Sequence, residues 1–176
     1  MEHHTVILAA GDFPKKGGTA WKLLADARRV VACDSAADAY RRRFRKWPTV
    51  IIGDLDSFSR PNLFPVPCSL IPVSEQDTND MEKAMVYCAK QGWRDPLIVG
   101  ATGKREDHSL GNVFRALDYN CTIVTDHGRF IPVRDKATFT VAKGAAVSIF
   151  APDPKTRMTS KGLEWPLDDV WFRNLY

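Results

Sequence analysis

The sequence predicts an α/β protein in which a doubly wound, mainly parallel sheet is followed by a small antiparallel β unit. Short apolar runs alternate with helix-length segments over the first 125 residues, as expected of a parallel sheet with helical crossovers. The runs are continuous rather than alternating, which is typical of strands covered by helices on both faces. From about residue 128 the helix-length segments stop, and β-rich alternation with Gly and Pro begins.

Each continuous apolar run predicts one strand of the sheet, and these runs cover residues 5–10, 29–33, 49–53, 96–100 and 121–125. The segments between them have helical spacing and suitable ends, which predicts helices over 19–27, 35–44, 80–92 and 107–119. In the C-terminal part, strands are expected in GRFIPV, ATFTVAK and AAVSIFA, at 128–133, 137–143 and 145–151. The change of pattern divides the chain into predicted domains 1–126 and 127–176.

The composition is that of a soluble globular protein. Apolar residues make up 44% of the 176 residues and charged residues 26%, which excludes disorder as the main state. No run approaches the roughly 18 apolar residues of a membrane span, and MEHHTVILAAGDFP lacks the features of a signal peptide. We therefore expect a cytoplasmic protein with no membrane partner. The cysteines at 33, 68, 88 and 121 form no CxxC pair, so we expect buried free thiols.

The net charge of +4 owes much to the basic run RRRFRK at 41–46. Clustered Lys and Arg are typical of nucleic-acid binding. The alternative is the solvated C-terminal end of a helix, where cations are favoured by the helix dipole. We favour the helix end and expect no nucleic-acid partner.

Aspartates recur at the carboxyl ends of the predicted strands, where open α/β sheets bind ligands. Asp54 and Asp56, followed by Ser57, form an oxygen cluster suited to Mg²⁺, although an Asx turn would use the same residues. Asp77 and Asp80 lie at a predicted helix start. They are either ligands or a capping box in which Asp77 is the cap.

The stretch GATGKREDHSLGN combines glycines at a strand exit with charged residues before a helix. Gly100 and Gly103 would let the backbone approach a phosphate closely, and the helix start offers unpaired N–H groups. Arg105 is suited to hold phosphate oxygens. Asp107 could accept from an amino group or orient His108, which could equally be a polar first-turn residue without a catalytic role.

Four motifs in order, GDLDS, DTNDMEKA, GATGKREDHSLGN and KGLEWPL, resemble those of the thiamine pyrophosphokinase family. The resemblance covers most of the chain. It implies transfer of pyrophosphate from ATP, with Mg²⁺, to the hydroxyethyl oxygen of thiamine, giving thiamine diphosphate and AMP. It also implies an α/β nucleotide-binding domain, a C-terminal β-sandwich that binds thiamine, and a homodimer with thiamine near the subunit interface.

The resemblance carries over to individual residues. It implies metal binding by Asp54, Asp56 and Asp80, and catalytic roles for these three residues together with Arg105 and Asp107. Thiamine is a quaternary cation, so an aromatic ring such as that of Trp165 suits its pocket, unless Trp165 belongs to the sandwich core. The residues expected to bind nucleotide or substrate are Asp34, Ser57, Asp77, Thr102, Gly103, Lys104, His108, Asn112 and Trp165.

The chain departs from the family pattern in three places. Lys104 replaces the usual second glycine, and CDSAADA replaces the more common ADGGA. The sequence ends at WFRNLY, before a Ser-Asn motif that contacts thiamine in the family, so we expect this chain to bind Mg·ATP but thiamine weakly. Two other functions stay open, namely a phosphatase with Asp54 as the nucleophile and a nonenzymatic nucleotide- or RNA-binding module.

Overall fold

The computed structural model describes residues 4–55, 67–75 and 77–175. By contacts the chain divides into two compact units, Met1–Lys136 and Ala137–Tyr176, each of which is described by itself. The predicted division into 1–126 and 127–176 stays a prediction. No helix within the described ranges combines the length and the apolar character that a membrane crossing requires.

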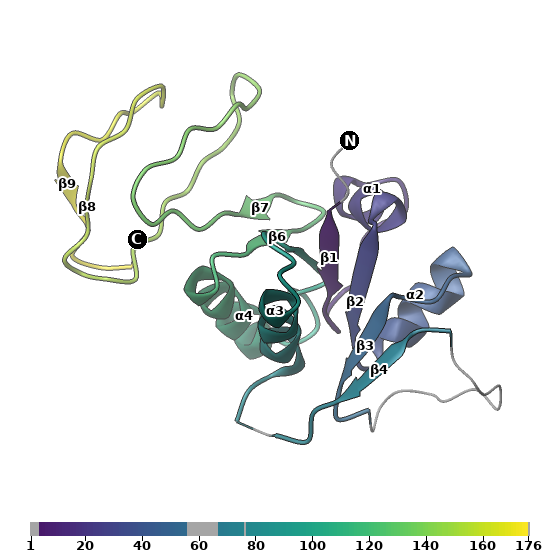
Figure 1. The fold of residues 1–176 in the computed structure, drawn as a ribbon. Coiled ribbons are helices and arrows are strands. Elements are labelled where there is room, and N and C mark those ends of the chain that lie inside the picture. Colours follow the sequence, from purple (N-terminus) through teal and green to yellow (C-terminus); the bar gives the residue numbers. More distant parts are fainter. Residues whose placement is uncertain (1–3, 56–66, 76, 176) are drawn as a thin grey trace. The chain divides into compact units, whose positions relative to one another are not determined.

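The first unit is built on a mostly parallel sheet (Figure 1). The described residues form seven strands in the order β4-β3-β2-β1-β5-β6-β7, all parallel except β7, which pairs antiparallel with β6. The strands are β1 (Thr5–Leu8), β2 (Arg29–Cys33), β3 (Val50–Gly53), β4 (Ser69–Pro72), β5 (Leu97–Val99), β6 (Thr122–Val124) and β7 (Arg129–Phe130). The helices are α1 (Thr19–Asp26), α2 (Ala36–Phe44), α3 (Asp80–Lys90) and α4 (Glu106–Asp118).

Helices cover both faces of this sheet because its strands are apolar on both sides. Ile7 and its counterparts on one face pack against Met85 of α3 and Ala116 of α4. Val6 and its counterparts on the other face pack against Leu24 of α1 and Tyr40 of α2. Every residue of β1 and β3 is buried. This doubly wound α/β arrangement confirms the predicted fold class.

The second unit contains a small antiparallel sheet, as predicted. Its described residues form two paired strands, β8 (Arg157–Met158) and β9 (Val170–Trp171). Two of the three expected positions were wrong, because the described runs 137–143 and 145–151 contain no strand. The third, 128–133, contains β7, which belongs to the first unit. Apolar side chains in these runs are exposed, among them Phe139 and Phe150. The alternation of apolar and polar residues there does not mark a strand with one buried face.

The order of the strands places a crevice at the carboxyl ends of the strands. From β1 the chain winds outward through β2, β3 and β4, then returns to the other side of β1 and continues through β5 and β6. The winding direction therefore reverses between β1 and β5. In open α/β sheets such a switch point, at the carboxyl ends of the strands, is where ligands bind.

Candidate active site

A cavity of about 170 Å³ opens at this switch point. It is lined by the loop after β1, the end of β2, the start of α3, the loop after β5 and the first turns of α4. Six of the residues predicted to form the site line it together: Asp80, Gly103, Lys104, Arg105, His108 and Asn112.

The two strand-exit loops are joined backbone to backbone. The N–H of Gly11 donates to the carbonyl of Gly100, and the N–H of Asp12 donates to that of Thr102, each at 2.8 Å. A Cβ on Gly11 would overlap both carbonyl oxygens. This position therefore requires glycine, and the contact extends the β1–β5 pairing into the rim of the cavity.

The loop into α4 brings two cations to the cavity. The Nζ atom of Lys104 donates to the carbonyl of Ala10 at 2.7 Å. The guanidinium of Arg105 donates to both carboxylate oxygens of Asp107, at 3.1 and 2.5 Å. These hydrogen bonds lower the pKa of Asp107 to about 2. Arg105 and Asp107 are therefore both charged at neutral pH, and a planar guanidinium is the kind of group that binds carboxylate or phosphate oxygens in pairs.

The acidic side of the site is assembled around Gly53. Asp80 is the first residue of α3, and Asp34 follows β2. A Cβ on Gly53 would lie 3.1 Å from the Cβ of Asp34 and 3.3 Å from Oδ2 of Asp80. Asp54, the next residue, is exposed at the exit of β3. The end of β3 thus has the acidic residues Asp34 and Asp80 as its close neighbours.

The capping interpretation of the acidic pair is wrong. The N-cap of α3 is Asn79, whose side chain accepts from the N–H of Glu82 at 2.9 Å. Asp77 is exposed and precedes the cap. The carboxylate of Asp80 instead lies 3.3 Å from the Nζ atom of Lys83, whose side chain is only 5% exposed. Asp80 therefore has a charged partner rather than a capping role.

The remaining predicted residues lie apart from the cavity lining or outside the description. Thr102 contributes its carbonyl to the contact between the loops. Trp165 lies in the second unit and is 78% exposed, so its interpretation as a core residue is wrong. Asp56 and Ser57 lie outside the described residues.

Some residues of the site were not predicted from the sequence. Cys33 lines the cavity, and its thiol donates to the carbonyl of Asp80 at 3.4 Å. Burial and the charge of Asp80 raise the pKa of this thiol, which keeps it protonated. Asn79 also lines the cavity. Its position just before an acidic first turn is an ordinary N-cap signal, but the neighbouring aspartates are equally good caps, so the sequence does not single out Asn79.

The acids fit a hard divalent cation by their donor type. Carboxylate oxygens are the ligands that Mg²⁺ prefers, and the Cβ atom of Asp34 and the carboxylate of Asp80 both lie next to Gly53, where a side chain has little room. Within the described ranges, no group of three or more His, Cys, Asp or Glu side chains is arranged to hold a metal. One of the three predicted ligands, Asp56, falls outside those ranges.

Comparison with known proteins relates this geometry to one family. The family model for the thiamin pyrophosphokinase catalytic domain matches residues 20–125, and the model for the substrate-binding domain matches residues 128–175. The two matches follow each other in the order that the four motifs predict.

Named relatives and a solved structure agree. The chain is 28% identical over 157 residues to thiamine pyrophosphokinase 1 of Arabidopsis thaliana, covering 77% of this chain and 58% of that protein. It is 26% identical over 109 residues to thiamin pyrophosphokinase 1 of Caenorhabditis elegans, covering 56% and 44%. The crystal structure of thiamin pyrophosphokinase from Geobacillus thermodenitrificans is 27% identical and superposes with a TM-score of 0.53, covering 68% of this chain and 59% of that one.

The chain thus spans less than two thirds of each of these relatives. The catalytic-domain model nevertheless matches more than half of the chain, and the resemblance predicted from the four motifs is confirmed. The chain belongs to the thiamin pyrophosphokinase family.

Proposed function

We propose that this protein is a thiamine pyrophosphokinase, which transfers pyrophosphate from Mg·ATP to thiamine and gives thiamine diphosphate and AMP. One observation carries the proposal. A cavity at the switch point gathers an acid from α3 and two cations from the loop after β5, in a chain that both domain models of the family cover in order.

The cationic side of the cavity suits a triphosphate. Lys104 and Arg105 lie at its rim, and α4 begins there with backbone N–H groups that no carbonyl within the helix can pair. Helix starts of this kind bind phosphate oxygens. In the proposed reaction these groups hold the phosphates, and Arg105 offsets the charge that develops as the pyrophosphoryl group moves.

The acidic side suits a magnesium ion. We propose that Asp54, Asp56 and Asp80 hold it, with Asp34 and Asp77 beside them. When bound, Mg²⁺ would neutralise phosphate charge and orient the pyrophosphoryl group. The position of Asp34 and of the Asp80 carboxylate next to Gly53, which directly precedes Asp54, supports this assignment. In Asp80→Asn we expect weaker Mg²⁺ binding by calorimetry in the absence of thiamine, as well as lower activity.

The chemical step is a displacement at the β-phosphorus of ATP. The hydroxyethyl oxygen of thiamine forms the new bond to this phosphorus, and the bond between it and the oxygen bridging to the α-phosphorus breaks. AMP leaves with that oxygen, and a carboxylate of the site takes the hydroxyl proton. Transfers of this type depend mainly on positioning and charge stabilisation, which is what the two charged sides of the cavity supply.

Thiamine and the dimer remain parts of the proposal. We propose that Trp165, which is 78% exposed, contacts the quaternary ring of thiamine near the interface of a homodimer. Aromatic faces attract such cations. The cytoplasmic location stays a prediction.

The direct test is to incubate the protein with ATP, Mg²⁺ and thiamine and to identify the nucleotide product by chromatography. AMP that forms only when thiamine is present supports the proposal. ADP, or free phosphate formed without thiamine, would contradict it and would favour the phosphatase alternative.

A further inference from the structure

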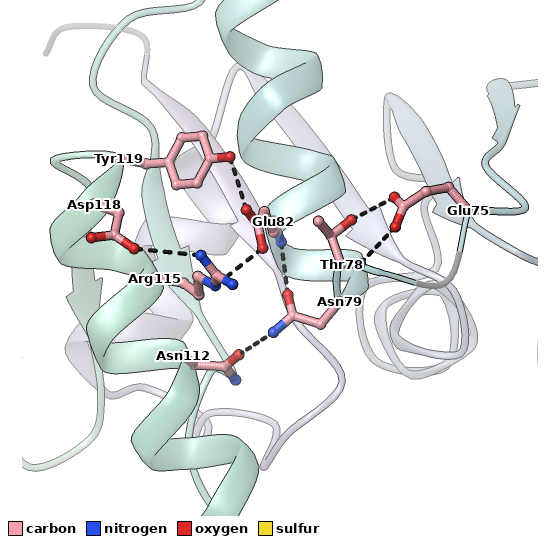
Figure 2. Close-up of polar contacts among 8 residues, drawn as sticks. All are labelled: Glu75, Thr78, Asn79, Glu82, Asn112, Arg115, Asp118 and Tyr119. Atoms are coloured by element: carbon pink, nitrogen blue, oxygen red, sulfur yellow. Dashed lines mark hydrogen bonds and ion pairs between the residues drawn. The ribbon is translucent and has the colours of Figure 1, made fainter.

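Two side-chain amides, those of Asn79 and Asn112, link the start of α3 to α4 (Figure 2). The Nδ2 atom of Asn112, on α4, donates to the carbonyl of Ala101 at 2.7 Å. Its Oδ1 atom accepts from Nδ2 of Asn79 at 3.1 Å. The Oδ1 atom of Asn79 in turn accepts from the N–H of Glu82 in the first turn of α3, at 2.9 Å. The oxygen and the nitrogen of both amides therefore have partners within the protein.

These hydrogen bonds join the two segments that carry the charged residues of the site. Asn79 immediately precedes Asp80, and Ala101 begins the loop that carries Lys104 and Arg105. Asn112 is buried, with 9% of its surface exposed. A buried amide with both ends engaged has one orientation only, because a flip would place donor against donor and acceptor against acceptor.

A second bridge joins the same two helices outside the described lining of the cavity. The hydroxyl of Tyr119 donates to Oε1 of Glu82 at 2.9 Å, and Nε of Arg115 lies 3.2 Å from its Oε2. Figure 2 shows this bridge on the other side of Glu82 from Asn79. It attaches α3 to α4 without touching the loop that begins at Ala101, and so provides a matched control.

We propose that Asn79 and Asn112 are positioning residues that set the distance between Asp80 and the loop bearing Lys104 and Arg105. They act through the backbone at Ala101 and at the start of α3 rather than by touching the nucleotide. The catalytic part of this inference rests on the proposed function. It also gives Asn112 a different role from the direct nucleotide contact predicted from the sequence.

The test uses Asn79→Ser and Asn112→Asp, with Tyr119→Phe as the control. Serine caps a helix about as well as asparagine but is too short to reach Asn112, so Asn79→Ser removes the link and keeps the cap. Asn112→Asp keeps the acceptor but loses the donor to Ala101. Tyr119→Phe removes one hydrogen bond between the same helices at the second bridge.

We expect Asn79→Ser and Asn112→Asp each to lower kcat by about 10-fold or more, because small displacements at a reacting centre have large rate effects. The KM for ATP should change by less than about twofold, since no contact with ATP is removed. Their combined effect should be smaller than the product of the two, because each variant breaks one hydrogen bond of the same chain. Tyr119→Phe should leave kcat unchanged while lowering Tm.

Two results would overturn the inference. One is equal kcat in Asn79→Ser and Tyr119→Phe. The other is a large rise in the KM for ATP in Asn112→Asp but not in Asn79→Ser, which would mean that Asn112 contacts the nucleotide directly.

Hydrogen exchange of the ligand-free protein separates this inference from the proposed function. The link predicts faster exchange of the amides at 101–105 in Asn79→Ser and Asn112→Asp, and wild-type rates there in Tyr119→Phe. Unchanged exchange in both asparagine variants would overturn the link even in an active enzyme. If the two asparagine variants exchange faster as predicted but the wild-type protein has no activity, the result would count against the proposed function alone.

Discussion

The Nζ atom of Lys83 lies 3.3 Å from Oδ1 of Asp80, one turn earlier in α3. The lysine side chain is 5% exposed and the aspartate side chain 32%. The ammonium group is thus withdrawn from water and depends on the carboxylate, whereas the carboxylate retains access to the cavity. Asp80 should therefore contribute both to stability, through Lys83, and to function, through its access to the cavity.

Asp80→Asn and Asp54→Asn should differ in stability but not in the direction of their effect on activity. Asp80→Asn leaves the buried ammonium of Lys83 without its carboxylate, so the free energy of unfolding should fall by about 1–3 kcal/mol. Asp54 is exposed, and its change should stay within about 0.5 kcal/mol. Both variants should lose activity by orders of magnitude, as expected of metal ligands.

Urea titrations and steady-state rates measure the two effects. Equal stability of the two variants would mean that the pair with Lys83 is not an energetic feature of the fold. Normal activity of Asp54→Asn at limiting Mg²⁺ would mean that Asp54 is a turn residue rather than a ligand.

Gly53→Ala should be more damaging than a matched glycine substitution. Gly53 has φ +149° and Gly92 has φ +68°, so alanine is strained at both positions. A Cβ at Gly92 meets nothing within 4 Å, whereas at Gly53 it meets Asp34 and Asp80. We expect unfolding free energies lower by about 1 kcal/mol for Gly92→Ala and about 3 kcal/mol for Gly53→Ala, which adds crowding to strain.

The activities of the two glycine variants separate the effect of backbone strain, which both share, from the effect of crowding against Asp34 and Asp80, which only Gly53→Ala has. Gly53→Ala should lose most of its activity because the carboxylates are displaced, and Gly92→Ala should keep it. Similar activity in both would show that the space around Gly53 is not needed for the site.

The pH dependence of Asp107 should follow its link to Arg105. Hydrogen bonds from Arg105 lower the pKa of Asp107 from 3.8 to about 2. Because the folded-state pKa is below the unfolded one, any stabilisation is present above about pH 4 and is lost as the pH falls through about 2. In Arg105→Gln the pKa should return toward 3.8. Carbon NMR of the labelled carboxyl measures it, and a value still near 2 would show that another group holds the charge.

Removal of the basic run should leave nucleotide binding intact. Arg41, Arg42 and Arg43 lie in the last turn of α2. The guanidinium of Arg41 lies 3.9 Å from the ring centroid of Trp47, and that of Arg43 lies 4.3 Å from that of Phe13. Changing all three arginines to Gln should lower the unfolding free energy by about 1–2 kcal/mol, since two cation–π contacts are lost. The KM for ATP should not change, and a large rise would show that the run binds phosphate.

Sequence patterns predicted the first unit well because its strands and helices differ in the spacing of apolar residues. The runs at β1 and β3 are fully buried and, apart from Thr5, contain no polar side chain, a pattern that turns and loops do not produce. β4 was not predicted. Its four residues are exposed or half-buried at the sheet edge, so its pairing with β3 leaves little trace in the sequence.

Positions of the site residues were predictable, but their partners were not. Motif spacing identified Asp80, Lys104 and Arg105, which meet at one cavity. Nothing in the sequence showed that Asn79 would bond to Asn112, 33 positions away, because such a contact depends on how α3 and α4 pack on the sheet. The same limit applies to Lys83, whose spacing from Asp80 is common to many exposed helical pairs.

The most direct test of the proposed activity follows the phosphorus atoms of ATP into the product. Two incubations with thiamine and Mg²⁺ would use ATP labelled at the β- or at the γ-phosphorus. Pyrophosphoryl transfer predicts that both labels appear in thiamine diphosphate in equal amounts and that the AMP released is unlabelled. Transfer of the γ label alone, or release of either label as phosphate without a labelled thiamine product, would contradict the account.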